Sequence, residues 1–325
     1  MDSLSGLDDR SVGKKYYRAL RFTNHGRNFS MTKIPTVEQM RATVQRLINQ
    51  YRNVQADESN YQQILQAVSD GLSGRSSTRE TATEEQFYFR ARMGRFEKSD
   101  PSQFSIPKPE YVSHGRCNLP ECPVFYVGDN PDIAFLEIGA RANDTVFLSL
   151  WRSRDSRPQL AQYGFVEENV CSEMAVDATK KIEFYRNIFR GAPEEILNHI
   201  IELQRSMATF LTAETWAISA ALSHHEIYDN DIDGISYPDA KRGISYNYAL
   251  SPSFSKQLEL CGIWECVAPE IGKQIEIPSF GTLSNGQIEW RELKTNADVQ
   301  EVHPLSLLKN ILGGKWKNRV GPPKH

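Results

Sequence analysis

The run Phe87-Tyr88-Phe89-Arg90-Ala91-Arg92 alternates along its length in the period-2 pattern of a β-strand. Two apolar runs, Val124 to Val127 and Thr145 to Trp151, follow it and predict buried strands. Helical patterns stand before and after this group of strands rather than between each pair. The chain is therefore expected to be α+β with segregated strands, and not a series of alternating βαβ units.

Several polar residues accompany these runs and suggest one kind of chemistry. Arg90 and Arg116 are fixed cations, with Arg92 as a spare candidate, and Glu137 is a carboxylate in a predicted helix from Pro131 to Ala140. Arginine holds phosphate oxygens in a bidentate fork and stays charged. A carboxylate can stabilise the positive charge that develops at a sugar carbon when a glycosidic bond breaks. The set therefore fits a site for a diphosphate joined to a sugar.

Each of these residues also has a purely structural interpretation. Arg90 can be the charge of an edge strand, Tyr126 can be a core residue, and Asn118 can serve a turn. Glu137 can face solvent, although its neighbours Leu136 and Ile138 leave little polar surface on that helix. A glutamate in such surroundings is either paired or functional.

The order of these residues resembles the RES-domain family. That family has an Arg after an aromatic-rich strand, then Gly-Arg-(aromatic)-Asn, a Tyr-containing strand, and Ala-x-x-Glu opening a helix. Gly115-Arg116-Cys117-Asn118 and Ala134-Phe135-Leu136-Glu137 match the two motifs. The family's later segments, Gly-Ile-x-Tyr-Pro-Ser and Asn-x-Ala-Leu, correspond to Gly234-Ile235-Ser236-Tyr237-Pro238-Asp239 and Asn247-Tyr248-Ala249-Leu250. The resemblance covers roughly residues 85–270 and includes a long middle insertion.

The resemblance implies an ADP-ribosyltransferase-like core of short strands with flanking helices, and cleavage of the nicotinamide–ribose bond of NAD. The arginines would bind the diphosphate, Tyr126 would orient the nicotinamide, and Glu137 would hold the ribose hydroxyls and stabilise the oxocarbenium-like transition state. Asp239 would complete the pocket. No prosthetic group is implied, because NAD enters as a substrate. The NAD-binding residues implied are Arg90, Arg116, Asn118, Tyr126 and Tyr237.

Two positions depart from the family pattern. Cys117 replaces the aromatic residue of the Gly-Arg motif, and Asp239 replaces the family's Ser. Aspartate adds a negative charge and cannot donate a hydrogen bond when ionised. Either the site is retuned, or the match is shifted by a few residues, or activity is lost; Ser236 and Ser245 are alternative hydroxyl donors.

The acceptor of the ADP-ribose stays open, since water, phosphate, or a protein or metabolite target would each define a different enzyme. The resemblance also implies a toxin-like role and an antitoxin or inhibitor protein as partner. Two other classes of function are kept: a catalytically silent module that binds ADP-ribose or NAD, and a structural or recruitment protein.

Residues 1–85 are expected to form a helical appendage and linker. Thr36 should cap a first helix, a second should cover Tyr61 to Leu72, and 73–85 should link to the rest. Residues 86–325 are expected to form the catalytic domain, with a helical insertion around 152–205.

Helices are further expected over Ala178 to Phe189, Pro193 to Gln204 and Met207 to His224. Asn285-Gly286 predicts a hairpin turn before a strand from Ile288 to Leu293.

Composition narrows the function classes. The 325 residues are 39% hydrophobic and 24% charged, which is ordinary for a globular protein. A net charge of −3 argues against general nucleic-acid binding. No apolar run is long enough for a membrane span, the start lacks a signal-peptide pattern, and a cytoplasmic location is expected.

Known cofactor and metal motifs give little support to other sites. Neither a Gly-x-Gly-x-x-Gly fingerprint nor a phosphate-binding Gly-x4-Gly-Lys-Ser/Thr loop occurs in the chain. Five cysteines do not suggest a disulfide framework. Isolated buried cysteines and no metal are expected, with a zinc site kept as an alternative for Cys117, Cys122, Cys261 and Cys266.

Overall fold

The computed structural model describes residues 35–73, 78–82, 85–154, 156–163, 182–183, 185–187, 190–191, 193–213, 215–238, 246–268 and 276–302. These residues form two compact units. Unit 1 draws on Met1–Thr83, Ile106–Tyr126 and Arg157–Lys256, and unit 2 draws on Glu84–Ser105, Val127–Ser156 and Gln257–His325. Each unit has its own apolar core. Asp239, Ser245 and most of the helix expected over 178–189 lie outside the described residues.

The first two helices of unit 1 match the sequence prediction. Helix α2 (Val37–Tyr51) begins after Thr36, whose side chain accepts a hydrogen bond from the Gln39 backbone N–H at 3.2 Å. The Gln39 side chain accepts one in return from the Thr36 N–H at 2.9 Å, which completes a capping box. Helix α3 (Tyr61–Leu72) follows with the predicted bounds.

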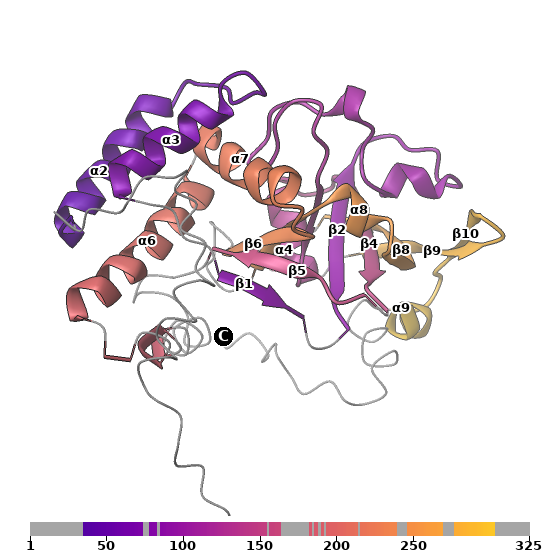
Figure 1. The fold of residues 1–325 in the computed structure, drawn as a ribbon. Coiled ribbons are helices and arrows are strands. Elements are labelled where there is room, and N and C mark those ends of the chain that lie inside the picture. The colour runs from indigo at the N-terminus through magenta and orange to yellow at the C-terminus, as the bar shows by residue number, and fades with distance from the viewer. Residues whose placement is uncertain are drawn as a thin grey trace, which may run out of the picture. The chain divides into compact units, whose positions relative to one another are not determined.

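Two further helices complete the helical layer of unit 1. Helix α6 (Glu194–Thr212) contacts α2, and helix α7 (Trp216–His224) contacts α3 (Figure 1). The prediction of one helix from Met207 to His224 was wrong, because Ala213 and Thr215 take extended backbone angles and separate the two helices. A single π-helical turn, η3 (His225–Asp229), continues α7.

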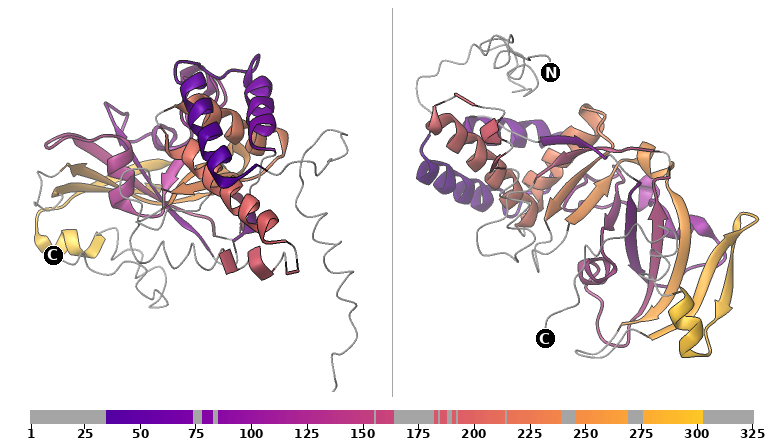
Figure 2. Two further views of the ribbon diagram at one scale, coloured as in Figure 1. Left: turned by 90° about the vertical axis from the view of Figure 1, so that its left-hand side faces the viewer. Right: turned by 90° about the horizontal axis from the view of Figure 1, so that it is seen from below.

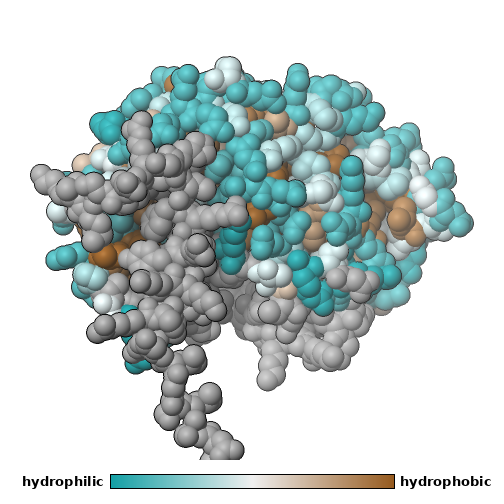
Figure 3. Space-filling view, viewed as in Figure 1, coloured by the Kyte–Doolittle hydropathy of each residue, from teal (hydrophilic) through white to brown (hydrophobic). Residues whose placement is uncertain are grey.

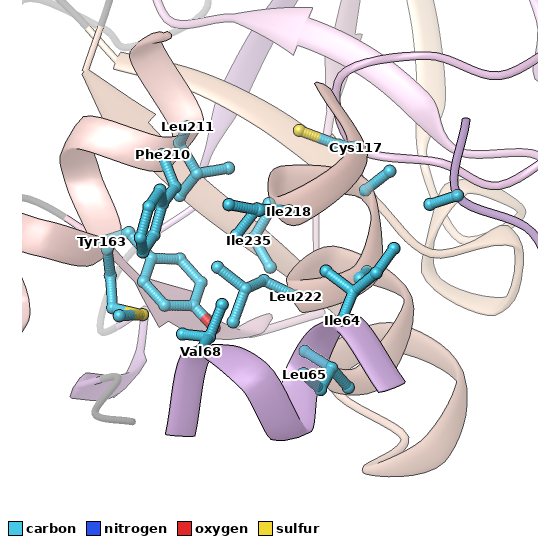
Figure 4. Packing of buried hydrophobic residues seen from close by; sticks show 14 of the residues in the cluster. Ile64, Leu65, Val68, Cys117, Tyr163, Phe210, Leu211, Ile218, Leu222 and Ile235 are labelled. Atoms are coloured by element: carbon cyan, nitrogen blue, oxygen red, sulfur yellow. The ribbon is translucent and has the colours of Figure 1, made fainter. Parts of the chain in front are cut away.

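The core of unit 1 lies between this helical layer and a sheet. Side chains of α3, α6, α7 and strand β6 (Gly234–Pro238) interdigitate in it, as Figure 4 shows for Ile64, Val68, Phe210, Leu222 and Ile235. All five are at most 2% exposed. Truncating such a side chain to Ala typically costs about 2–5 kcal/mol. Helices α2 and α3 thus contribute to this core.

The sheet of unit 1 has the strand order β1-β5-β6-β7. Its strands are β1 (Thr78–Thr81), β5 (Gln159–Gln162), β6 (Gly234–Pro238) and β7 (Tyr246–Leu250). Strands β5 and β6 are parallel, and the other two pairs are antiparallel. Strand β1 lies in the stretch predicted to be a linker, and β5 lies in the predicted helical insertion, so both expectations are corrected there.

Unit 2 is built on an antiparallel sheet with the order β2-β4-β8-β9-β10. The strands are β2 (Phe87–Met93), β4 (Thr145–Arg152), β8 (Glu259–Val267), β9 (Glu276–Ser284) and β10 (Gln287–Glu292). Strand β3 (Phe125–Gly128) crosses from one unit to the next, and Gly128 pairs with Phe89 of β2. Helices α4 (Pro131–Glu137) and α9 (Asn296–Val302) pack on one face.

The predicted hairpin is confirmed. Asn285 and Gly286 have φ angles of 49° and 79° and join β9 to β10. Two positive φ angles are those of a type I′ turn, which Asn-Gly favours. Short elements complete the described chain: η1 (Pro101–Phe104), η2 (Pro109–Tyr111) and α8 (Pro252–Ser255).

The described residues form a mixed α+β protein, as predicted, and its strands are mostly antiparallel. Figure 2 gives two further views of the helices and strands. On the face drawn in Figure 3, hydrophilic residues predominate and apolar residues show in small separate areas. No helix in the described part of the chain has the length and apolarity needed to cross a membrane.

Candidate functional site

Three predicted site residues of unit 1, Arg116, Asn118 and Tyr126, gather around one tight turn, Gly115 to Asn118. The Gly115 N–H donates to the Asn118 carbonyl at 3.1 Å and closes the turn. The Tyr126 hydroxyl accepts from the Cys117 N–H at 2.8 Å and donates to Asn118 Oδ1 at 2.8 Å. Asn118 Nδ2 donates to the carbonyls of Ser113 and Leu119 at 2.7 and 2.9 Å. Asn118 and the Tyr126 hydroxyl therefore build and hold this turn.

Gly115 is required by close packing in the same turn. A Cβ atom at this position would collide with Asn118 Oδ1 and would stand 3.1 Å from the Tyr126 hydroxyl. A larger residue could enter only if the Asn118 side chain moved and gave up its hydrogen bonds. The glycine of the Gly-Arg-x-Asn motif thus has a structural reason within this chain, independent of any ligand.

Arg116 is half-buried and lies at the C-terminal end of α6. Its Nη1 donates to the Leu211 carbonyl and, at 3.5 Å, to the Ala213 carbonyl. Carbonyls at the end of a helix lack intrahelical donors and carry partial negative charge, so a guanidinium stabilises them. An arginine has five N–H donors, and these contacts use one terminal nitrogen.

Arg90 lies in the middle of β2 and pairs in register with Ser149 of β4. Its neighbours Phe89 and Ala91 pack into the core of unit 2, on the face that α4 covers. Because successive strand residues point to opposite faces, Arg90 projects from the other face. Tyr88 and Trp151, also partners in register, lie beside it on that face.

Ser149 links the residues of this second face. Its hydroxyl donates to the Arg90 carbonyl at 3.2 Å and accepts from Trp151 Nε1 at 2.8 Å. Ser149 is 2% exposed and Trp151 is 6% exposed. No sequence motif nominated either residue. Their spacing of two within a predicted strand would have put them on one face, but only the register places that face beside Arg90.

Arg92 shares a face with Arg90, because the two are two residues apart on one strand. Its guanidinium donates to the Gln103 carbonyl and lies 5.0 Å from the centre of the Phe96 ring. Burial lowers the pKa of Arg92 from its usual value. These contacts give Arg92 a role in holding the loop after β2.

Glu137 is the last residue of α4 and is exposed. The helix expected from Pro131 to Ala140 is therefore shorter than predicted and ends at Glu137. Helix α4 covers the face of the sheet that carries Phe89 and Ala91. Arg90 projects from the opposite face of that sheet.

Tyr237 is 3% exposed and belongs to the apolar core of unit 1, on the helix-facing side of β6. Its position is that of a packing residue. Asp239, the residue in the family's Ser place, lies outside the described residues.

The cysteines do not form a metal site within the described residues. In that part of the chain, no group of three or more His, Cys, Asp or Glu side chains is placed to hold a metal ion. Cys117 and Cys122 lie in unit 1, and Cys261 and Cys266 lie in unit 2. Burial raises the pKa of the Cys261 thiol to about 11 and that of Cys122 above its usual value. Both therefore resist forming the thiolate that binds metals.

No profile of a known family matches the chain, and no curated protein matches it. A chain from the M. tuberculosis MbcT–MbcA toxin–antitoxin complex aligns with 64% of this chain and 92% of its own length, at 12% identity and a TM-score of 0.29. A TM-score this low supports no conclusion about fold or function. The class that the described residues define is a mixed α+β protein.

Proposed function

We propose that this protein cleaves the nicotinamide–ribose bond of NAD and transfers the ADP-ribose to water, phosphate or a specific target. The support is the ordered set of residues from Arg90 to Leu250 that resembles the RES-domain pattern. In this proposal NAD is the substrate, and no prosthetic group takes part.

The observation that carries the proposal is the setting of Arg90. This arginine is half-buried in the centre of a paired strand, with the aromatic residues Tyr88 and Trp151 beside it on the same face. A guanidinium fork next to aromatic side chains suits a phosphate joined to a flat ring system, because the fork binds the phosphate oxygens and the rings pack against the flat group.

Glu137 is assigned the ribose hydroxyls and the stabilisation of the oxocarbenium-like transition state. The assignment rests on the Ala-x-x-Glu match, and the exposure of Glu137 means that a ligand can approach it from solvent. Glu137 and Arg90 are assigned different roles, so each role needs its own test.

The roles of the unit 1 residues in this proposal rest on the resemblance alone. Arg116 is assigned a diphosphate contact through its other guanidinium nitrogens, since Nη1 serves α6. The Tyr126 hydroxyl and the Asn118 amide already serve the turn, so Tyr126 is assigned only a contact through its ring. Tyr237 supports the site by packing, and Asp239 is assigned the completion of the pocket.

Steady-state kinetics on two charge-altering variants test the proposal. Arg90→Lys keeps the charge but loses the bidentate fork, so KM for NAD should rise more than kcat falls. Glu137→Gln removes the carboxylate charge, so kcat should fall by about 10²–10³. Arg95→Lys and Glu289→Gln, which change exposed residues of unit 2 in the same way, are the matched controls. Glu137→Gln with full NAD turnover would remove Glu137 from the mechanism.

A nucleotide-binding module without turnover is the second candidate, and Asp239 in place of Ser favours it. Calorimetric titration with ADP-ribose separates the two functions, since a silent module binds this ligand and releases no nicotinamide from NAD. Activity gained in Asp239→Ser would identify the aspartate as the cause of silence.

An antitoxin-like partner is proposed on the same resemblance. Expression of the chain alone should arrest bacterial growth if NAD is depleted, and Glu137→Gln should relieve the arrest. Normal growth with the active wild-type chain would remove the toxin-like role.

A further inference from the structure

A row of uncharged polar residues crosses the sheet of unit 1. Ser236 of β6 is in register with Gln162 of β5 on one side and Tyr248 of β7 on the other. Ile235 and Tyr237 point into the core beneath the helices, so alternation places Ser236 on the opposite face of the sheet. Residues in register on adjacent strands have neighbouring side chains, so Gln162, Ser236 and Tyr248 form a contiguous row.

Ser236 stands out in this row. It is 2% exposed, and its hydroxyl has no hydrogen-bond partner among the residues described. A buried hydroxyl without a partner is destabilising, and the few such groups in folded proteins call for an explanation. Its flanking residues Gln162 and Tyr248 are only half-buried, so the row meets solvent on both sides of the serine.

The rest of this face suits a flat, uncharged group. Tyr246 and Tyr248 are two residues apart on β7 and share the face, and both are half-buried. Aromatic rings stack on flat heteroaromatic groups. Within the three described strands β5, β6 and β7, the outer face carries no charged side chain. A carboxylate ligand would therefore find no cation on these strands.

We infer that the row Gln162–Ser236–Tyr248 binds a planar heteroaromatic ring that bears an uncharged carboxamide. A carboxamide offers one acceptor and two donors, and an amide, a hydroxyl and a phenol together can match them. The Ser236 hydroxyl gains its missing partner from the ligand. This inference rests on the proposed function, in which the ligand is the nicotinamide end of NAD. It makes Ser236 a residue that selects ligands with a carboxamide over ligands with a carboxylate.

Ligand-observed NMR titration with free nicotinamide and nicotinic acid tests the row without requiring turnover. Wild-type protein should bind nicotinamide and discriminate against nicotinic acid. Ser236→Ala should weaken nicotinamide binding about three- to tenfold, the loss expected for one neutral hydrogen bond. Ser206→Ala is the matched control, because Ser206 is also buried in unit 1 but its hydroxyl donates to the Glu202 carbonyl at 2.8 Å.

Thermal unfolding of the same variants shows whether weaker binding is caused by a loss of folded structure. Ser236→Ala removes a hydroxyl that has no partner in the described structure, so it should unfold at the same or a higher temperature than wild type while it binds nicotinamide less tightly. Tyr248→Phe, which removes a second hydroxyl of the row, should weaken binding in the same direction.

The outcomes separate this inference from the proposed function. Three results would each refute the binding role of the row. They are equal nicotinamide binding by wild type and Ser236→Ala, equal binding of nicotinamide and nicotinic acid by wild type, and no binding of nicotinamide by wild type. If Ser236→Ala cleaves NAD with an unchanged KM, the row does not bind nicotinamide, but the proposed NAD-cleaving function is retained. If the wild-type protein binds nicotinamide but does not cleave NAD, and Ser236→Ala loses this binding, the binding role of the row is supported and the proposed enzymatic function is refuted.

Discussion

Single side chains in this protein carry several hydrogen bonds each, and the turn from Gly115 to Asn118 is the clearest case. One hydroxyl, that of Tyr126, accepts from the Cys117 backbone and donates to the Asn118 side chain. Asn118 and Cys117 are buried. The arginine of the same turn is thereby fixed against α6.

Removal of the Tyr126 hydroxyl should destabilise the fold. Tyr126→Phe leaves the Cys117 N–H and Asn118 Oδ1 without this partner, so the free energy of unfolding should fall by about 1–3 kcal/mol. Urea denaturation measures the change. Exposed Tyr111→Phe in the same unit is the control and should be close to neutral. An undiminished stability of Tyr126→Phe would show that the turn does not depend on this hydroxyl.

Ser149 should stabilise unit 2 through its hydrogen bonds with Arg90 and Trp151. Ser149→Ala removes the hydroxyl that accepts a hydrogen bond from the buried Trp151 side chain, which should cost about 1–3 kcal/mol of stability. Ser149→Thr keeps a hydroxyl and should recover much of the loss. The side-chain N–H signal of Trp151 in an NMR spectrum of tryptophan-labelled protein should shift in the Ala variant and return in the Thr variant. If neither variant moves that signal, the hydrogen bond is not formed in solution.

At the scale of elements, the β9–β10 hairpin depends on backbone conformation. Gly286 has a φ of 79°, and a Cβ atom added there would meet no heavy atom within 4 Å, so conformation rather than space limits substitution. Gly286→Val should lower the free energy of unfolding by about 1–3 kcal/mol, because a β-branched residue resists positive φ. Gln287→Val, at an exposed position of β10, should be near neutral. Equal effects of the two changes would contradict the assigned turn.

The stability of unit 1 should respond to pH through three histidines, of which His224 is buried and the other two are half-buried. Burial lowers the pKa of His114, His199 and His224 below the ordinary value of about 6.5. The unfolded chain then binds more protons than the folded protein just below that pH. Stability should therefore be fully present above about pH 6.5 and should fall as the pH drops toward about 5.

His224 offers a specific test of this pH dependence. The centre of its ring lies 4.6 Å from that of Tyr61 in α3 and 4.8 Å from that of Tyr228, and the titratable groups around it are Asp229, Glu58 and His225. His224→Phe keeps an aromatic ring and removes the titrating group, so the free energy of unfolding should depend less steeply on pH between about 7.5 and 5. Urea denaturation at several pH values measures this slope. A slope equal to that of wild type would exclude His224 as a contributor.

Elements with strong local signals could be predicted from the sequence. The capping box at Thr36, the apolar spacing of Tyr61 to Leu72 and the Asn285-Gly286 turn all confirm local patterns. Strand β1, with the sequence Thr-Arg-Glu-Thr, has no apolar alternation and forms only by pairing with β5. The chain between α6 and α7, from Ala213 to Thr215, contains neither glycine nor proline, so no local signal marked the break.

At the scale of the whole molecule, two compact units each enclose their own core. The order of motifs in the sequence was enough to predict Arg90, Arg116, Tyr126 and Glu137 as candidate site residues. It could not show from which face of the sheet Arg90 projects, since that depends on strand register and on which face α4 covers. The engagement of Arg116 with α6 is likewise a contact between residues far apart in the chain.

Nicotinamide release from NAD is the most direct measurement of the proposed activity. Purified protein is incubated with NAD, with and without phosphate, and the products are separated by chromatography. Free nicotinamide is expected in both conditions or in one, together with ADP-ribose or its phosphorylated form, and the release should be lost in Glu137→Gln. Absence of nicotinamide in every condition, or equal release by Glu137→Gln, would contradict the proposal.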